Sequence, residues 1–407
     1  MNTLQRQYVL ITGNYWAFTL TDGALRMLVV LYFNELGYSP LEIALLFVFY
    51  EFFGVVTNLL GGWLGAHLGL NRTMNIGLGL QLLALAMLLV PTTLLTVPWV
   101  MAAQALSGIA KDLNKMSAKS AVKLLVPSGQ QGRLFRWVAL LTGSKNALKG
   151  LGFFLGGALL ALWGFQGAVA AMLATLFAVW VASLILLTPG LGKMRSKPAL
   201  SRLLAKRAEI NALSAARFFL FGARDIWFVI AVPVHFATVF GWSSVQVGSF
   251  FALWVIGYGG VQTIAPRLTG HSALQGGATV ALWTGLLAMV ACGIALTPGA
   301  ASFVDTRSLL GWPLPELTLV CGLIVFGVLF AVVSSLHSYL IVSYADSEGV
   351  ALDVGFYYMA NAMGRLFGTV ASGWLYQTQS LQSCLIGSAI MLGGATALSL
   401  LLPKPLD

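Results

Sequence analysis

The chain has 407 residues, of which 58% are hydrophobic and only 9% are charged. Its mean hydropathy is +0.86, whereas soluble domains carry about 25% charged residues. This composition excludes a soluble globular protein and predicts that most of the surface faces lipid. The three cysteines, Cys292, Cys321 and Cys384, are too few and too widely spaced for a disulfide framework or a metal centre.

Apolar runs long enough to cross a bilayer recur along the whole chain. A transmembrane helix needs about 20 apolar residues, and twelve such runs are separated by Gly, Pro, Asn or charged residues. The first run lacks the pattern of a cleaved signal peptide, so we expect it to be retained. We predict an all-α integral membrane protein with transmembrane helices near residues 8–33, 41–65, 73–95, 97–126, 133–162, 166–188, 210–238, 244–268, 276–298, 316–345, 350–376 and 380–402.

The lysines and arginines of the loops fall on one side of this topology. Twelve of them lie on that side, and Arg307 alone lies in a loop on the opposite side. The positive-inside rule therefore places both termini in the cytoplasm. The basic segment 189–209 is most simply an orientation signal that contacts lipid headgroups, with a regulatory binding role as the alternative.

Faint internal repeats suggest that the chain arose by duplication. The segment Leu36–Ala44 lines up with Phe240–Gly248, and Asn146-Ala147-Leu148 resembles Asn361-Ala362-Met363. Six spans per half are typical of the major facilitator architecture, in which two six-helix bundles hold substrate between them at mid-membrane. We therefore predict an N-terminal bundle over 1–188, a cytoplasmic linker over 189–209 and a C-terminal bundle over 210–407.

The superfamily's charged motif after the second span is degenerate in this chain. Ala66 occupies the place of its acid and Leu70 the place of an arginine, whereas Gly62 and Gly69 fit a tight turn.

The predicted spans contain more positive than negative charges. Charged residues inside a membrane are costly and face a partner, a cavity or a ligand. A surplus of four positive charges therefore predicts an anionic ligand. The cations are Arg26, Lys111, Lys115, Lys119, Lys145, Lys149, Arg217, Arg224 and Arg365, and the acids are Asp22, Glu51, Asp112, Asp225 and Asp353.

Several of these cations lie near mid-membrane. Lys111 and Lys145 each stand 17 residues from the turn near Ser128, which corresponds to about 25 Å of helix. Basic residues of both halves reach a similar depth, as a carrier of a multiply charged anion requires. The predicted substrate-binding residues are Arg26, Lys111, Lys115, Lys145, Lys149, Arg224 and Arg365.

Four lysines recur at intervals of four residues in the fourth span, which places them along one helix face. We interpret Lys119 and Lys123 as an entry funnel that draws anions toward Lys111. The alternative is that these amines reach toward the headgroups and that Asp112 pairs with Lys115. Lys111 lies too deep for that alternative.

The acids leave two interpretations open. Asp22 and Asp225 are candidates for carrying a coupling proton, or they form structural ion pairs, Asp22 with Arg26 at i,i+4. Glu51 and Asp353 are more simply packing residues. Possible further ligand contacts are Asn114, Asn146 and His337, although a lone histidine among hydroxyl residues is more often an interhelical contact.

No motif of an enzyme, a metal site or a nucleotide-driven pump appears in the sequence. We therefore expect no cofactor and no nucleic-acid partner, and transport that runs on gradients.

Several longer stretches resemble the ArsJ family, the bacterial arsenic-resistance permeases of the major facilitator superfamily. The likeness covers almost the full chain and includes most of the charged residues named above. The stretches that carry it are Tyr15–Arg26, Leu70–Asn75, Gly108–Ser120, Gly143–Gly150 and Phe221–Asp225.

The resemblance implies an inner-membrane exporter of 1-arseno-3-phosphoglycerate that confers arsenate resistance. This anion forms when glyceraldehyde-3-phosphate dehydrogenase uses arsenate in place of phosphate, so a functional link to that enzyme is implied as well. The expected partners are this substrate and membrane lipid, and we expect a monomer. Composition and spacing alone support only a multiply anionic, phosphate-like substrate. Two alternatives remain open, a general organophosphate or carboxylate antiporter and a receptor or assembly protein that binds without transport.

Overall fold

A computed structural model describes residues 3–125, 131–187, 207–269, 276–297, 308–309, 312–344 and 350–403. Among these, the side chains of 3–4, 61–67, 119–125, 131–143, 263, 266–267, 339, 342–343 and 350–352 are outside the description. The side chains of Lys119 and Lys123, most of the basic segment 189–209 and Arg307 therefore lie outside the described residues.

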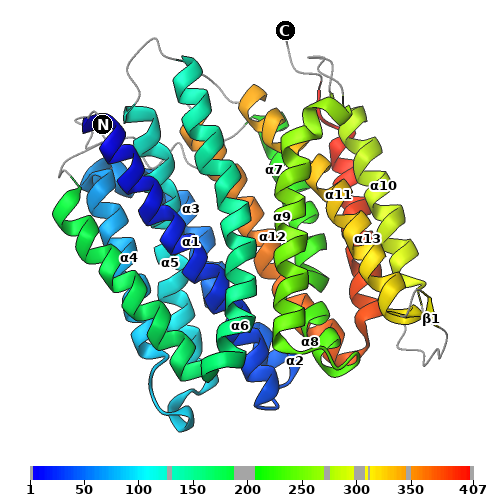
Figure 1. Cartoon of the computed structure of the whole chain (residues 1–407). Helices are drawn as coiled ribbons and strands as arrows, with labels where there is room; N and C mark the ends of the chain where they lie inside the picture. The colour runs from blue at the N-terminus through cyan, green and yellow to red at the C-terminus, as the bar shows by residue number, and fades with distance from the viewer. Residues whose placement is uncertain are drawn as a thin grey trace. The chain divides into compact units, whose positions relative to one another are not determined.

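Nearly all of the described chain is helical (Figure 1). The helices before residue 187 are α1 (Thr3–Glu35), α2 (Pro40–Leu46), α3 (Val48–Leu68), α4 (Leu70–Met87), the short 3₁₀ helix η1 (Thr92–Leu94), α5 (Val97–Leu125) and α6 (Gln131–Leu186). Those after residue 207 are α7 (Ala208–Phe228), α8 (Ala231–Thr238), α9 (Ser244–Thr269), α10 (Gly277–Ala295), α11 (Leu314–Tyr344), α12 (Val350–Thr378) and α13 (Leu381–Ser399). A two-residue hairpin, β1 (Ser308–Leu309) with β2 (Trp312–Pro313), lies between α10 and α11.

The helices have the length and composition of membrane spans. In the described part of the chain, eight are long and apolar enough to cross a bilayer. Large apolar side chains such as Leu253 and Ile390 are exposed, whereas small polar ones such as Ser388 are buried. Apolar exposure with polar interiors suits helices that face lipid. Helix occupies most of each of the twelve predicted ranges in the described part of the chain, and the all-α membrane fold is confirmed.

Two long helical stretches are interrupted where the sequence suggested continuity. The predicted span 41–65 is divided between α2 and α3 at Phe47, and the span 210–238 between α7 and α8. In the second case Pro233 explains the break, because a proline ring clashes with the carbonyl group four residues earlier. The Ala231 N–H beyond the break donates instead to Ser372 Oγ at 3.1 Å. By contrast, the predicted separation of 133–162 from 166–188 is confirmed within α6, where Gly164 has a φ of 63°.

The two segments matched by the internal repeat share a backbone turn. Gly37 has a φ of 83° and Gly241 a φ of 68°, a region that favours glycine. Gly37 lies three residues before the start of α2, and Gly241 lies three residues before the start of α9. In the first copy Ser39 and Glu42 form a reciprocal capping box. The similarity of these segments is therefore structural as well as sequential.

The chain forms two compact units that are not its two continuous halves. The first unit contains Met1–Tyr32, Phe49–Ser201 and Ser244–Ile256, and the second contains Phe33–Val48, Arg202–Ser243 and Gly257–Asp407. Thus α2 packs on α12 in the second unit, and the beginning of α9 packs on α6 in the first. The boundaries at 188 and 210 stay a prediction, because the segment between them is largely outside the described residues.

Glycines let helices of each unit approach closely. In the first unit a Cβ on Gly23 of α1 would stand 2.9 Å from the Lys149 carbonyl oxygen of α6. In the second, a Cβ on Gly368 of α12 would stand 2.6 Å from the Gly222 carbonyl oxygen of α7. Small residues at such crossings are the usual means of packing helices in a membrane.

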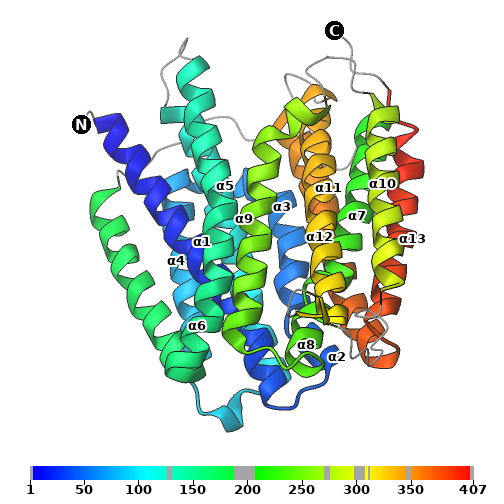
Figure 2. The same cartoon turned by 45° about the vertical axis from the view of Figure 1, so that its right-hand side comes forward.

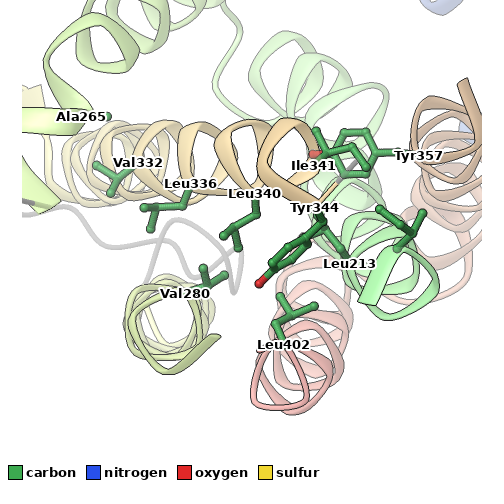
Figure 3. Packing of buried hydrophobic residues seen from close by; sticks show 11 residues of the cluster. Leu213, Ala265, Val280, Val332, Leu336, Leu340, Ile341, Tyr344, Tyr357 and Leu402 are labelled. Carbon is green, nitrogen blue, oxygen red and sulfur yellow. The ribbon is translucent and has the colours of Figure 1, made fainter. Parts of the chain in front are cut away.

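A buried apolar cluster joins several helices of the second unit (Figure 3). Leu336 and Leu340 of α11 pack in it with Val280 of α10, Leu213 of α7 and Tyr357 of α12. Figure 2 shows α10, α11 and α13 side by side, as Figure 1 does. This cluster fixes α11 against α7, the helix that carries two of the buried arginines.

Gly108 provides a test of the close packing between α3 and α5. A Cβ there would overlap the Tyr50 carbonyl oxygen, which belongs to a rigid backbone. We expect Gly108→Ala to lower stability by about 1–3 kcal/mol, although alanine favours helix more than glycine does. The measurement is thermal unfolding of the purified protein in detergent. Gly13→Ala is the matched control, since no atom lies within 4 Å of its Cβ position. Equal unfolding temperatures for both variants would contradict the close approach.

Candidate functional site

Charged side chains of α1, α3 and α5 converge on Tyr50 in the first unit. The Tyr50 hydroxyl donates a hydrogen bond to Asp22 Oδ1 at 2.6 Å. Lys111 Nζ lies 3.9 Å from the centroid of the Tyr50 ring, and Arg26 Cζ lies 5.2 Å from it. One buried ring thus stabilises two cations through its π face and binds a carboxylate through its hydroxyl.

The ion pair considered between Asp22 and Arg26 does not form, and this interpretation is corrected. Arg26 Nη2 instead donates to Glu51 Oε1 of α3 at 2.9 Å, and the Glu51 side chain is fully buried. The reason is that α3 brings Tyr50 and Glu51, adjacent in sequence, to the two charges of α1. Glu51 is thus the ion-pair partner of Arg26, and its role as a packing residue stays a prediction.

A second group of charges lies between α3 and α5. Lys115 Nζ is 2.6 Å from Oδ1 of the fully buried Asp112, and it donates to Asn58 Oδ1 at 2.5 Å. The i,i+3 ion pair considered for Asp112 and Lys115 is therefore present. Gly54 allows the approach of the helices, because its Cβ position lies 3.2 Å from Asp112 Oδ2 and 3.6 Å from Lys111 Nζ.

The remaining predicted site residues of the first unit with described side chains lie on α5 and α6. Asn114 is buried, donates to the Ala110 carbonyl oxygen at 2.9 Å and packs against Gly77 of α4. Lys145, Asn146 and Lys149 are half-buried along α6. Lys149 Nζ lies 5.6 Å from the centroid of the Phe153 ring. The backbone of Lys149 packs on α1 at Gly23, between Asp22 and Arg26.

In the second unit the carboxylate of Asp225 forms ion pairs with two arginines. Arg224 Nη2 lies 2.5 Å from Asp225 Oδ1, and Arg365 Nε of α12 lies 3.1 Å from Asp225 Oδ2. Asp225 is fully buried, and both arginine side chains are mostly buried. The arrangement depends on Gly368, whose Cβ position is 3.0 Å from Asp225 Cβ. The structure therefore brings the predicted residues Arg224, Asp225 and Arg365 together.

Arg217 is a buried cation that our predicted site did not include. Its Nη1 donates to the Ser334 carbonyl oxygen at 3.3 Å and to Ser334 Oγ at 3.2 Å. Its guanidinium carbon lies 4.0 Å from the centroid of Phe221. The sequence held a signal for it, because Arg217 and Arg224 are seven residues apart and so lie on one face of α7.

His337 stands three residues after Ser334 on α11 and is fully buried. Among the described residues neither ring nitrogen has a hydrogen-bond partner. The interhelical hydrogen bond considered as its structural role is thus not found in the described part of the protein.

In both units the charged residues near the middle of the described spans include more cations than acids. The first unit has three carboxylates, on Asp22, Glu51 and Asp112, for five cations, Arg26, Lys111, Lys115, Lys145 and Lys149. In the second unit Asp225 lies well inside α7 with Arg217 and Arg224, and Arg365 lies well inside α12, whereas Glu42, Glu316 and Asp353 stand in the first turns of α2, α11 and α12. Asp225 alone cannot neutralise three arginines. Among the described residues no group of His, Cys, Asp and Glu could hold a metal ion.

Comparison with known proteins decides the family. The profile described as Major Facilitator Superfamily matches residues 11–341, most of the chain. The chain belongs to the major facilitator superfamily. A search of curated protein sequences gives no significant match.

Solved structures of other major facilitator transporters share this fold over their whole length. A structure titled as giving insights into substrate recognition in proton dependent oligopeptide transporters has a TM-score of 0.71 and 15% identity, with 98% of each chain covered. The nucleoside transporter NupG has a TM-score of 0.70 and 15% identity, again with 98% of each chain covered. The human organic anion transporter MFSD10 has a TM-score of 0.65 and 16% identity, with 98% of this chain and 100% of that chain covered. At these identities the likeness shows the fold alone.

The shared carboxylate of the second unit yields a stability prediction for this major facilitator protein. We expect Asp225→Asn to destabilise the protein by about 3–5 kcal/mol, because it leaves two buried guanidinium groups without their counter-charge. The measurement is thermal unfolding in detergent, and the double variant Asp225→Asn with Arg365→Gln should recover part of the loss. An Asp225→Asn protein as stable as the original would show that the ion pairs contribute nothing to folding.

Proposed function

We propose that this protein exports an organoarsenical anion, 1-arseno-3-phosphoglycerate, by alternating access, and that export confers arsenate resistance. The observation that supports an anionic substrate is the excess of cations over carboxylates near the middle of the spans in both units. A permanent excess is costly in a low-dielectric interior, and a bound oxyanion offsets that cost.

The chemistry of these side chains suits phosphate-like groups. Arginine presents a planar fork that binds two oxyanion oxygens at once, as Arg26, Arg224 and Arg365 would do. Lys111 and Lys145 add compact point charges, with Lys115 and Lys149 a turn away from them. Lys119 and Lys123 remain our proposal for the entry funnel. Asn114, Asn146 and His337 remain proposed as secondary contacts.

The arsenic-containing identity of the substrate rests on sequence resemblance. The stretches that resemble the ArsJ family include Asp22, Arg26, Lys111, Lys145 and Arg224. The charges that need an anion are therefore largely those of the matching stretches. With this identity we propose a monomer in a bacterial inner membrane with cytoplasmic termini. We also propose a functional link to glyceraldehyde-3-phosphate dehydrogenase.

Asp22 and Asp225 are our candidates for coupling. Each is buried, and each is bound by a donor, Asp22 by Tyr50 and Asp225 by two arginines. A proton on either carboxylate would change the hydrogen bonds that position the neighbouring cations. Asp225 would also compete with a substrate oxyanion for the same two guanidinium groups.

Transport in everted vesicles tests the proposed binding residues. We expect Lys111→Ala and Lys145→Ala each to lower substrate uptake at least about tenfold, because each removes a charge that binds the oxyanion. Arg6→Gln is the control, since Arg6 is an exposed cation at the start of α1. Uptake at the control level by both lysine variants, at equal protein level, would remove these lysines from the site.

Arsenate survival tests the substrate. We expect a sensitive host to gain resistance only when the exporter is expressed together with glyceraldehyde-3-phosphate dehydrogenase, because the enzyme makes the exported anion. Resistance from the exporter alone, unchanged by the enzyme, would refute the organoarsenical substrate. Strong competition by inorganic phosphate and 3-phosphoglycerate, with no arsenate resistance, would favour a general organophosphate or carboxylate antiporter. Saturable binding without transport would indicate a receptor.

A further inference from the structure

Arg217 is a buried charge that no carboxylate of the described residues neutralises. Its residue is only 4% exposed. Of the described residues, no carboxylate lies within ion-pair distance of it. A guanidinium group is always charged in proteins, and an unpaired buried charge is strongly destabilising. Arg217 therefore differs from Arg26, Arg224 and Arg365, each of which has a carboxylate within 3.1 Å.

Neutral groups position Arg217 without removing its charge. Ser334 of α11 accepts two long hydrogen bonds from it, at 3.2 and 3.3 Å. Tyr258 of α9 donates to Ser334 Oγ at 3.1 Å, and Gln262 donates to the Tyr258 hydroxyl at 2.7 Å. This chain of hydrogen bonds runs from half-buried residues of α9 to the buried guanidinium. Arg217 Nε has no hydrogen-bond partner among the described residues.

His337 is a second, independent sign of a ligand near this place. It lies one helical turn from Ser334 on α11, and residues three apart are neighbours on a helix surface. The side chain is fully buried, and neither ring nitrogen finds a partner within the described part of the chain. Any form of the imidazole carries at least one N–H donor, and a buried donor without an acceptor is costly. An oxyanion would supply acceptors for this N–H and for Arg217 Nε.

Arg217 and Arg224, one of the two arginines paired with Asp225, both lie near the ring of Phe221. The guanidinium carbons of Arg217 and Arg224 lie 4.0 and 4.8 Å from the same ring centroid. The two groups are therefore no more than about 9 Å apart, with an aromatic ring beside both. That spacing suits the two ends of a short organic molecule with a charged group at each end.

We propose that Arg217, with Ser334 and His337, forms a second oxyanion subsite, separate from the one at Arg224 and Arg365. The ligand class is a three-carbon organic anion with an oxyanion at both ends. This inference rests on the proposed function and deepens it, because it adds to the proposed contacts of the first unit one contact for each end of the substrate in the second unit. The subsite at Arg217 makes the protein select molecules with two charged ends over those with one.

Binding to the purified protein in lipid nanodiscs, measured by calorimetry, tests this selection. The probes are 3-phosphoglycerate, which has a phosphate and a carboxylate, and glycerol 3-phosphate, which replaces the carboxylate with an alcohol. We expect the unmodified protein to bind 3-phosphoglycerate at least about tenfold more tightly than glycerol 3-phosphate. Arg217→Gln should abolish that difference by weakening 3-phosphoglycerate alone. Arg224→Gln should weaken both probes.

The outcomes separate this inference from the proposed function. Binding of neither probe by the unmodified protein would overturn this inference, whereas the proposed function is overturned by the arsenate survival test. A full preference for 3-phosphoglycerate in Arg217→Gln would overturn only the second subsite. If Arg217→Gln fails to fold, Ser334→Ala provides the test, because it removes one acceptor of Arg217 and keeps the charge. It should reduce the preference several-fold, and an unchanged preference would overturn the subsite.

Discussion

The cost of holding positive charge in a low-dielectric interior governs how this protein is built. Several of the described cations contact a compensating group on a neighbouring side chain. Arg26 meets the carboxylate of Glu51, Lys111 meets the ring of Tyr50, and Arg224 shares Asp225 with Arg365. These compensations use side chains from neighbouring helices, so they also fix how the helices pack. What they leave over near the middle of the spans is net positive charge, and our proposal of an anionic substrate rests on this surplus.

Close helix packing makes these contacts possible. Lipid supplies no hydrophobic drive between helices, so their association depends on tight contact. Glycines stand where the charged groups meet: Gly54 beside Lys111 and Asp112, Gly23 against Lys149, and Gly368 beside Asp225. A larger residue at these positions would separate the helices and lengthen the ion pairs. The glycines are thus part of the site even though they offer no chemistry of their own.

The sequence was sufficient for features that depend on local patterns. Apolar length located the spans, and the break within α6 at Gly164 falls where the two predicted spans part. It was insufficient where a partner comes from another helix. The i,i+4 spacing of Asp22 and Arg26 suggested a pair within α1, yet α3 supplies a nearer partner for each. Tyr50 gave no signal as an uncharged residue in an apolar run. Arg217 was signalled only by its spacing from Arg224, and it became distinctive when no carboxylate of the described residues was found within ion-pair distance. Pro233 is a sequence signal for the break before α8. The hydrophobicity is continuous around it, however, and so the sequence analysis predicted one unbroken span over 210–238.

Asp225 has a consequence for the empty protein. Its carboxylate occupies the guanidinium groups of Arg224 and Arg365 from within the polypeptide. A small inorganic ion such as chloride offers one charge and no forked geometry, so it is a poor rival for a carboxylate that is already in place. Only a ligand with several oxygens has enough to gain by displacing it. We therefore expect the unloaded transporter to be poorly permeable to the abundant halide of its surroundings.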